Sequence, residues 1–251
     1  MTSTDLTDSQ WQQIKQFIPD VNRKRKYDLK EIFNALFFIV KTGSQWRLLP
    51  KEYPNWQLVY FYFRKWNEEE IMDFVLDMLR EKVRSKRGRN PSPTAGIIDS
   101  QSVRSCNNVA LKSFDGNKKV KGRKRHIIVD TNGFLLSVLV TVAHLHDSSV
   151  AELLFRRLKE NLSGIKIIFA DGGYRGELIA RTKMKFNYLI KIVMRSDKTD
   201  NFQVIPRRWV VERTFSWFEN DRRLCRDYET LMESTEAMIK LSAIKLLVRK
   251  F

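Results

Sequence analysis

The sequence predicts an α/β fold in which an all-helical segment precedes a mixed β-sheet covered by helices on both faces. Up to about residue 84, apolar residues recur at the spacing of amphipathic helices, whereas short apolar runs typical of strands alternate with helical patterns after that. The basic stretch 85–93 between them contains one glycine and two prolines, which oppose regular structure. We therefore predict a helical domain over 1–84, a linker over 85–93 and an α/β domain over 94–251.

Four helices are predicted in the first domain, because each apolar pattern follows a typical start signal. Thr7/Asp8, Asp28 and Asn55 are capping signals for the first three helices, and the acidic stretch "NEEE" (67–70) suits the positive end of the fourth helix dipole. The longest apolar run, 32–40, is too short for the roughly 20 residues that span a bilayer, so we predict a buried helix there. A helical domain rich in aromatic and basic residues fits a DNA-reading helix-turn-helix module or a plain helical bundle.

The second domain reads as three strands followed by alternating helices and strands. Strands are predicted at 94–103, 123–130, 133–143, 165–171 and 188–194, and helices at 148–161, 174–185, 206–223 and 234–249. The order βββαβαβα describes an antiparallel meander followed by parallel crossovers, which matches a ribonuclease H-like fold. In such a sheet the first and fourth strands are neighbours.

The charge balance indicates a polyanionic partner. With 46 Lys and Arg residues against 29 Asp and Glu residues, the formal net charge is +17, so nucleic acid is the first partner to consider. The start of the chain, "MTSTDLTDSQ", has neither the basic nor the apolar part of an export signal, and a cytoplasmic location is expected. Cys106 and Cys225 lack the spacing of a zinc site or a disulfide framework.

Three acidic residues stand out when they are placed on the predicted elements. Asp99 lies inside the first strand, Asp171 ends the fourth strand, and Glu212 lies in the helix "RRWVVERTFSWFEN". Neighbouring strands would set the two aspartates side by side, and a helix crossing that end would bring Glu212 to them. Converging carboxylates repel one another unless a cation lies between them, and hard divalent ions prefer such oxygen ligands. The pattern therefore predicts a site for Mg²⁺ or Mn²⁺, with two ions.

Two of the three acidic residues also have a structural interpretation. Asp171 precedes two glycines and could simply be a turn residue, while Glu212 could form an exposed helix ion pair with Arg208 one turn earlier. Asp99 has apolar neighbours in its strand, where a charge without a partner is costly, so a ligand role is favoured.

Basic residues near these carboxylates are the candidate DNA contacts. The run "GNKKVKGRKRH" (116–126) is either a solvated face or a phosphate-binding surface, and its position beside a strand favours phosphate contact. We also include Arg208 and two residues at the end of the third helix. The candidates are Lys118, Lys119, Lys121, Arg123, Lys124, Arg125, Arg208, Arg64 and Lys65.

Five stretches together resemble DDE transposases of bacterial insertion sequences, in the subgroup with a small helical N-terminal domain. They are "KTGSQWRLLPKEYPNWQLVYFYFRKW", "IIDSQSV", "NKKVKGRKRHIIVDTNGFLL", "FADGGYRG" and "RRWVVERTFSWF…RRLCRDYE". The resemblance covers nearly the whole chain. It implies that Asp99, Asp171 and Glu212 form the metal-binding catalytic triad, and that Arg208 and Glu212 match the family's Arg-x₃-Glu pattern. Many relatives carry a basic residue where this chain has Glu219, and Arg222 or Arg223, one turn later on the same helix, would substitute.

The resemblance also implies a reaction and its partners. Metal-activated water would cut DNA at the terminal inverted repeats of an element, and the freed 3′-hydroxyl would then attack a target phosphodiester. No nucleotide cofactor is expected, and the chain has no phosphate-binding GxxxxGK[ST] loop. A homodimer on double-stranded DNA, in the bacterial cytoplasm and associated with the nucleoid, follows by analogy. Two alternatives stay open: a metal-dependent nuclease that never joins ends, and a DNA-binding remnant impaired by Glu219.

Overall fold

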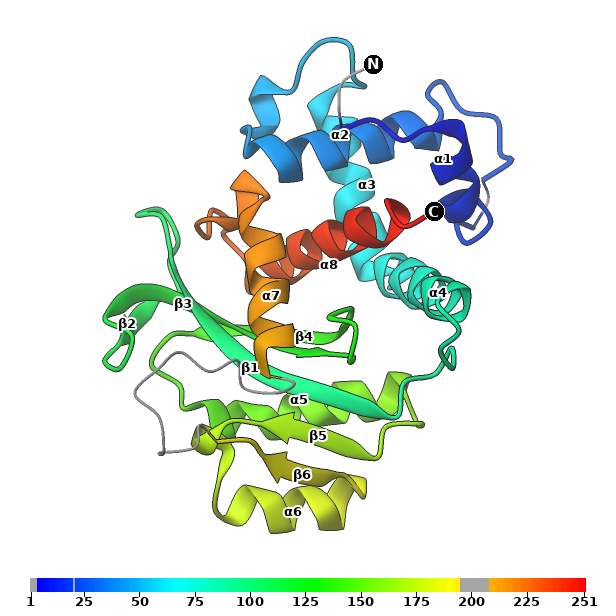
Figure 1. Ribbon diagram of the computed structural model, residues 1–251. Helices are drawn as coiled ribbons and strands as arrows, with labels where there is room; N and C mark the ends of the chain where they lie inside the picture. Colours follow the sequence, from blue (N-terminus) through cyan, green and yellow to red (C-terminus); the bar gives the residue numbers. More distant parts are fainter. Residues whose placement is uncertain (1–3, 20, 195–207) are drawn as a thin grey trace. The chain divides into compact units, whose positions relative to one another are not determined.

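The chain folds into two compact units. The computed structural model describes residues 4–19, 21–194 and 208–251. Unit 1 combines Met1–Pro91 with Phe218–Phe251, and unit 2 is Ser92–Trp217 (Figure 1). These units differ from the expected domains, because the carboxyl-terminal segment of the predicted 94–251 domain belongs to the helical unit.

Unit 1 is entirely helical among its described residues. Its elements are α1 (Asp8–Lys15), α2 (Leu29–Thr42), η1 (Trp46–Leu48), α3 (Trp56–Glu68), α4 (Ile71–Lys86), η3 (Arg222–Leu224) and α8 (Met232–Val248). The side chains of Thr7, Asp28 and Asn55 cap α1, α2 and α3, which confirms the three predicted start signals. The fourth start was placed too early: α4 begins at Ile71, and the preceding Glu70 has a left-handed backbone with φ 56°.

Helix α8 is the centre of unit 1. The apolar residues of α8 lie on all sides of the helix, and most of its side chains are buried. This distribution is expected for a helix that is enclosed by other helices. It packs against α2 and α4, and the ammonium group of Lys240 lies 2.6 Å from a carboxylate oxygen of Asp73 on α4. The buried Asp221 accepts hydrogen bonds from Ser242, at 2.6 Å, and from Lys245. The packing on α2 and α4 and the pair with Asp73 join the two segments of unit 1, while Asp221 fixes η3 to α8.

Unit 2 is built on one mixed sheet. Its elements are β1 (Ala95–Arg104), β2 (Ser113–Asp115), β3 (Val120–Val129), β4 (Leu135–Val142), α5 (Asp147–Asn161), β5 (Ile167–Ala170), η2 (Gly172–Tyr174), α6 (Glu177–Phe186), β6 (Leu189–Ile192) and α7 (Arg208–Glu219), the last of which extends into unit 1. The strand order is β2-β3-β1-β5-β6, with β4 also paired to β3. Strands β1, β3 and β4 are antiparallel neighbours, whereas β1, β5 and β6 are parallel. This arrangement confirms the predicted α/β class and the predicted pairing of the first and fourth strands.

The helices position the sheet and its turns. Helices α5 and α6 share one buried cluster with β1, β3, β4, β5 and β6. Helix α7 lies beside the turn between β3 and β4, where Arg213 and Thr214 donate hydrogen bonds of 2.9 Å to the carbonyl groups of Asn132 and Gly133. A side chain at Gly133 would collide with Thr214, since its Cβ would come within 2.8 Å of the hydroxyl. Glycine at this turn therefore allows the close approach of α7.

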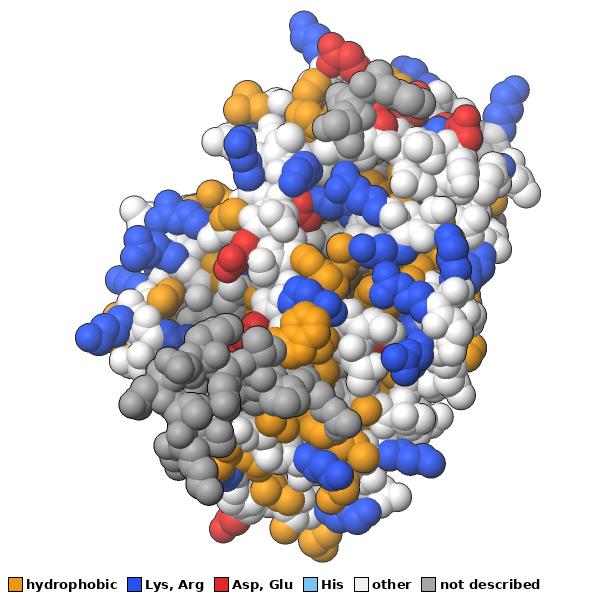
Figure 2. Space-filling model, viewed as in Figure 1, with side chains coloured by type: hydrophobic (Ala, Val, Ile, Leu, Met, Phe, Trp, Pro, Cys, Tyr) orange, Lys and Arg blue, Asp and Glu red, His pale blue; other side chains and the backbone are white. Residues whose placement is uncertain are grey.

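Lysine and arginine side chains are spread over the face of the molecule shown in Figure 2, and acidic side chains are fewer there. No helix in the described part of the chain is long and apolar enough to span a lipid bilayer. Cys106 and Cys225 are both free thiols.

Candidate active site

Asp99 and Asp171 occupy equivalent positions on neighbouring parallel strands. The register pairs Ile97 of β1 with Phe169 of β5, and each aspartate lies two residues after its member of this pair. Side chains two residues apart point to the same face of a strand, so the two carboxylates lie on the same face of the sheet, Asp99 within β1 and Asp171 directly after β5.

The environment of Asp99 disfavours its charge. Burial raises the pKa of its carboxyl to about 6, although the backbone N–H of Ser100 donates a hydrogen bond of 2.7 Å to it and opposes the shift. The negative charge of Asp171 raises this pKa further, while the nearby cations of Lys118 and Arg208 lower it. Asp99 is therefore a carboxylate that gains from an added cation.

Asp171 serves the turn as well as the site. It follows directly after β5, and its Oδ1 accepts a hydrogen bond of 2.9 Å from the N–H of Gly173, which fixes the carboxylate at the start of η2. A Cβ on Gly173 would lie 3.1 Å from this oxygen, tighter than ordinary contact, so glycine leaves the carboxylate room. The structural interpretation of this residue as a turn former is confirmed.

Glu212 reaches the site through Arg208. The guanidinium Nη2 of Arg208 lies 3.8 Å from Asp171 Oδ2 and 3.6 Å from Glu212 Oε1, so one cation bridges the strand and helix α7. The side chain of Glu212 is 58% exposed, whereas that of Arg208 is only 23% exposed. The ion pair expected one helical turn apart is present.

The donor groups of the site are carboxylate oxygens. In the described ranges, no group of three or more His, Cys, Asp or Glu side chains is arranged to hold a metal ion. The available donors are hard carboxylate oxygens with a mutual repulsion at Asp99 and Asp171, and this chemistry suits a divalent cation. The guanidinium group of Arg208 supplies the positive charge beside the carboxylates of Asp171 and Glu212.

The basic run divides into an exposed and a buried part. Lys118, Lys119 and Lys121 are exposed, and the ammonium group of Lys118 donates a hydrogen bond of 2.7 Å to the carbonyl of Ser100, next to Asp99. These three exposed lysines remain candidate phosphate contacts.

The remaining residues of the run, Arg123, Lys124 and Arg125, are buried within β3. The Arg123 guanidinium donates to the carbonyl of Leu111 at 2.8 Å, and the Lys124 ammonium lies 3.1 Å from a carboxylate oxygen of Asp147. At this depth they stabilise the sheet, which corrects the expectation of a continuous phosphate-binding surface. Internal partners lowered the cost of burying these charges, and the sequence did not reveal them.

Arg222 and Arg223 differ in position from what the resemblance implied. Helix α7 ends at Glu219, and both arginines lie in the separate helix η3, not one turn further along the same helix. Arg223 is buried and forms an ion pair of 2.7 Å with Glu229, while Arg222 remains exposed.

The two candidates on α3 also differ from each other. Arg64 and Glu68 form an exposed ion pair of 2.6 Å. Lys65 is 3.8 Å from Glu69 and lines a pocket of unit 1.

Two residues near the carboxylates were missed from the sequence. Tyr174 is buried, and burial followed by the charges of Asp147, Asp99 and Asp171 raises the pKa of its hydroxyl far above the usual value. Arg213 lies between two indole rings, with its guanidinium carbon 4.4 Å from the ring centroid of Trp209 and 4.6 Å from that of Trp217. The spacing of four residues on either side of Arg213 is the signal that would have identified this stack.

Comparison with known proteins identifies relatives of this chain. Residues 90–244 match the family model described as "Transposase DDE domain", and residues 6–76 match one described as "Putative transposase of IS4/5 family". The chain is 32% identical over 130 residues to a "Putative transposase for insertion sequence element IS402" from Burkholderia cepacia, over 48% of this chain and 60% of the relative. It is 26% identical over 82 residues to "Uncharacterized protein y4sN" from Sinorhizobium fredii, over 32% of this chain and 66% of that protein.

The aligned parts thus span less than two thirds of either relative. The first family model, in contrast, covers more than half of this chain and includes Asp99, Asp171 and Glu212. The mixed sheet of unit 2 has the ribonuclease H-like fold that such a domain implies. The chain belongs to the transposase DDE domain family.

Proposed function

We propose that the protein is a DNA transposase that cuts at the ends of an insertion sequence and joins the 3′-ends to target DNA. The observation that carries the proposal is the pairing of β1 with β5, which sets Asp99 and Asp171 at equivalent positions, together with Arg208, which links Asp171 to Glu212. Membership of the family and the formal net charge of +17 support DNA as the substrate.

The acidic residues of the site would bind metal ions, and its arginine would bind a DNA phosphate. Asp99, Asp171 and Glu212 would hold divalent cations, Mg²⁺ or Mn²⁺, with the two aspartates supplying fixed oxygens from the sheet and the exposed Glu212 an adjustable one. Two such ions, when bound, activate an attacking oxygen and stabilise the leaving oxygen of a phosphodiester. Arg208 would turn from the carboxylates to a DNA phosphate once their charge is compensated, since its contacts of 3.6 and 3.8 Å are longer than good hydrogen bonds.

Other candidate contacts would hold the DNA backbone. Lys118, Lys119 and Lys121 are exposed and suited to bind phosphates, as is Arg222 in unit 1, and Lys118 lies beside Asp99. Two element ends must be handled together, so we infer a homodimer on double-stranded DNA. No nucleotide cofactor is needed, because phosphodiester bonds are exchanged directly. We place this activity in the bacterial cytoplasm, at the nucleoid.

A strand-transfer assay tests the proposal. The full chain is incubated with Mg²⁺, a supercoiled target and labelled DNA ends taken from the inverted repeats that flank the coding region. We expect labelled target product from the wild type and none from Asp99→Ala, Asp171→Ala or Glu212→Ala, each of which should still bind the ends.

The products separate the alternatives. Nicked ends without joined product would identify a nuclease that does not transpose. Binding without cleavage by the wild type would identify a catalytically impaired DNA-binding protein. In that case Glu219→Lys is the first variant to assay for recovered cleavage. Cleavage at the wild-type rate by any one of the three alanine variants would remove that residue from the site.

A further inference from the structure

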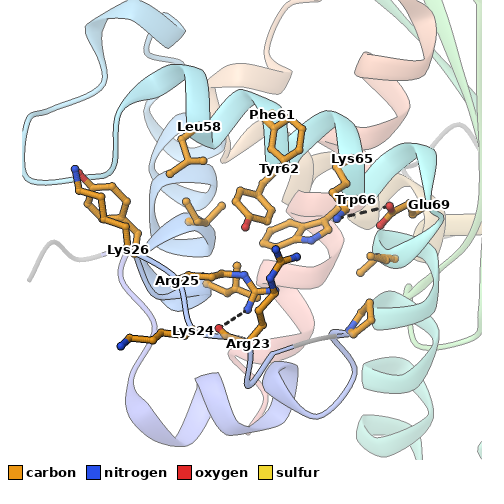
Figure 3. Close-up of a pocket in the computed structure, with 15 residues that line it drawn as sticks. Arg23, Lys24, Arg25, Lys26, Leu58, Phe61, Tyr62, Lys65, Trp66 and Glu69 are labelled. Carbon is orange, nitrogen blue, oxygen red and sulfur yellow. Dashed lines mark hydrogen bonds and ion pairs between the residues drawn. The ribbon is translucent and has the colours of Figure 1, made fainter.

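A pocket of about 510 Å³ opens in unit 1 between the segment that joins α1 to α2 and one face of α3 (Figure 3). One side carries four consecutive cations, Arg23–Lys26. The other side carries Phe61, Tyr62, Lys65 and Trp66 of α3. Figure 3 shows Tyr62 and Trp66 extending from α3 toward the segment with Arg23 and Arg25.

The lining of this pocket is strongly positive. It contains five Lys or Arg residues against one acidic residue, Glu69. Among the described residues, no carboxylate forms an ion pair with Arg23, Lys24 or Lys26. The pair between Lys65 and Glu69 is long, at 3.8 Å, and exposed, so it holds Lys65 only weakly. These cations are available to an anionic ligand.

Ring contacts with the core of unit 1 hold Trp66 and Tyr62 in place. Trp66 is 2% exposed and stacks on Phe33 with ring centroids 4.6 Å apart, while Tyr62 packs on Trp66 at 5.2 Å. Phe61, at the rim, is 56% exposed although it is a large apolar residue. Tyr62 is half-buried and is held by its packing on Trp66, so little side-chain entropy is lost when a flat ring stacks on it.

The combination selects one kind of ligand. A duplex presents phosphates to a protein surface and keeps its base faces inside the stack, whereas an unpaired nucleotide offers a flat base together with flanking phosphates. We propose that this pocket receives an unpaired DNA nucleotide, with its base stacked on Tyr62 beside the inclined ring of Phe61 and its flanking phosphates on Arg23, Lys24 and Lys26. The inference rests on the proposed function insofar as that makes DNA the polyanion. It adds a second kind of DNA contact, outside the carboxylate site.

Binding of short oligonucleotides to the full chain tests the cations. The probes are a fluorescent single strand, the same strand with abasic sites in place of its bases, and the corresponding duplex, each measured by anisotropy over a range of salt. The triple variant Arg23→Ala/Lys24→Ala/Lys26→Ala removes three phosphate contacts, so its slope of log affinity against log salt on the single strand should fall by about 2. The matched control Lys15→Ala/Lys51→Ala/Arg89→Ala removes the same charge from elsewhere in unit 1 and should keep a steeper slope.

A second pair of variants tests the base. Tyr62→Leu keeps an apolar side chain against Trp66 but removes the ring, and it should weaken binding of the normal strand roughly 5- to 150-fold. Binding of the abasic strand should not change. Phe74→Leu is the matched control, since Phe74 is 52% exposed in unit 1 and lies outside this pocket. Phe61→Ala, at the exposed rim, should act in the same direction as Tyr62→Leu without disturbing the core.

The outcomes distinguish this inference from the proposed function. Wild-type binding of the normal strand by both Tyr62→Leu and Phe61→Ala would overturn the pocket assignment, as would equal loss on the abasic strand, which would indicate backbone contact only. In either case strand transfer by the wild type would leave the proposed function standing. A wild type that binds none of the three DNAs would refute both.

Discussion

Replacing Asp99, the half-buried aspartate of the candidate site, should make the protein more stable at neutral pH. The substitution Asp99→Asn keeps the size of the side chain and the oxygen that accepts the 2.7 Å hydrogen bond from Ser100. It removes only the charge, which burial and the neighbouring Asp171 disfavour.

The size and the sign of the effect follow from the pKa of this carboxyl. Folding raises it from an ordinary value of 3.8 to about 6, so the folded protein holds the proton more tightly than the unfolded chain between these values. The cost of ionising Asp99 therefore grows as the pH rises through this window and stays at its full size above it. A shift of about two pKa units at about 1.4 kcal/mol each corresponds to roughly 3 kcal/mol.

Urea unfolding of both proteins at pH 4 and pH 8, without divalent cations, measures this difference. We expect the variant to be more stable at pH 8 by up to roughly 3 kcal/mol and nearly equal to the wild type at pH 4. His126, whose pKa burial lowers to about 4, titrates in the same window but is present in both proteins, so its contribution cancels.

Asp115→Asn is the matched control with the opposite sign. Burial alone would raise the pKa of Asp115, but hydrogen bonds from Ser102 and from the backbone of Lys118, together with the charge of Lys124, lower it to about 2. This carboxylate stabilises the fold above its unfolded pKa, and the control variant should be less stable than the wild type at pH 8. An Asp99→Asn variant that is less stable at pH 8, or equally shifted at both pH values, would refute the reasoning.

Three further predictions concern the fold. Asp221→Ala leaves the ammonium group of Lys245 buried without its carboxylate and should cost about 3–5 kcal/mol in urea unfolding, whereas a loss within experimental error would show that the pair is dispensable. A chain that ends at Trp217 lacks α8, so residues 1–91 should lose cooperative thermal unfolding by circular dichroism; a sharp transition of the helical signal would contradict the assignment of unit 1. Because the pKa of His126 is lowered from 6.5 to about 4 by burial, the melting temperature of the wild type should fall as the pH drops from 6.5 to 4, and His126→Gln should flatten this dependence.

The elements that local patterns determine were predicted well. Apolar runs located β1, β3, β4, β5 and β6 to within a few residues, and single polar residues located the starts of α1, α2 and α3. Strand β2 was missed because it has three residues, of which Phe114 is 56% exposed, so it has no apolar pattern.

Features that depend on distant partners were not predicted from the sequence. Helix α8 was expected as a helix, but its apolar residues lie on all sides, and no single face indicates which part of the chain it joins. The burial of Arg123 and Lys124 depends on contacts with Leu111 and Asp147. The residue pattern of the strand does not predict these partners.

The candidate site shows the same division. The neighbouring positions of Asp99 and Asp171 followed from strand order, because parallel strands fix the level at which their residues stand. The bridge from Arg208 to Asp171 depends on where α7 packs against the sheet. A helical pattern in the sequence predicts the helix but not the position at which it packs.

The division of unit 1 between the two ends of the chain also matters during synthesis. A ribosome delivers α1 to α4 well before α8, the helix around which they pack. Until α8 follows, the apolar sides of α2 and α4 lack this partner, and exposed apolar surface of this kind promotes aggregation and chaperone binding. A polypeptide that stops before Met232 cannot complete the core of unit 1.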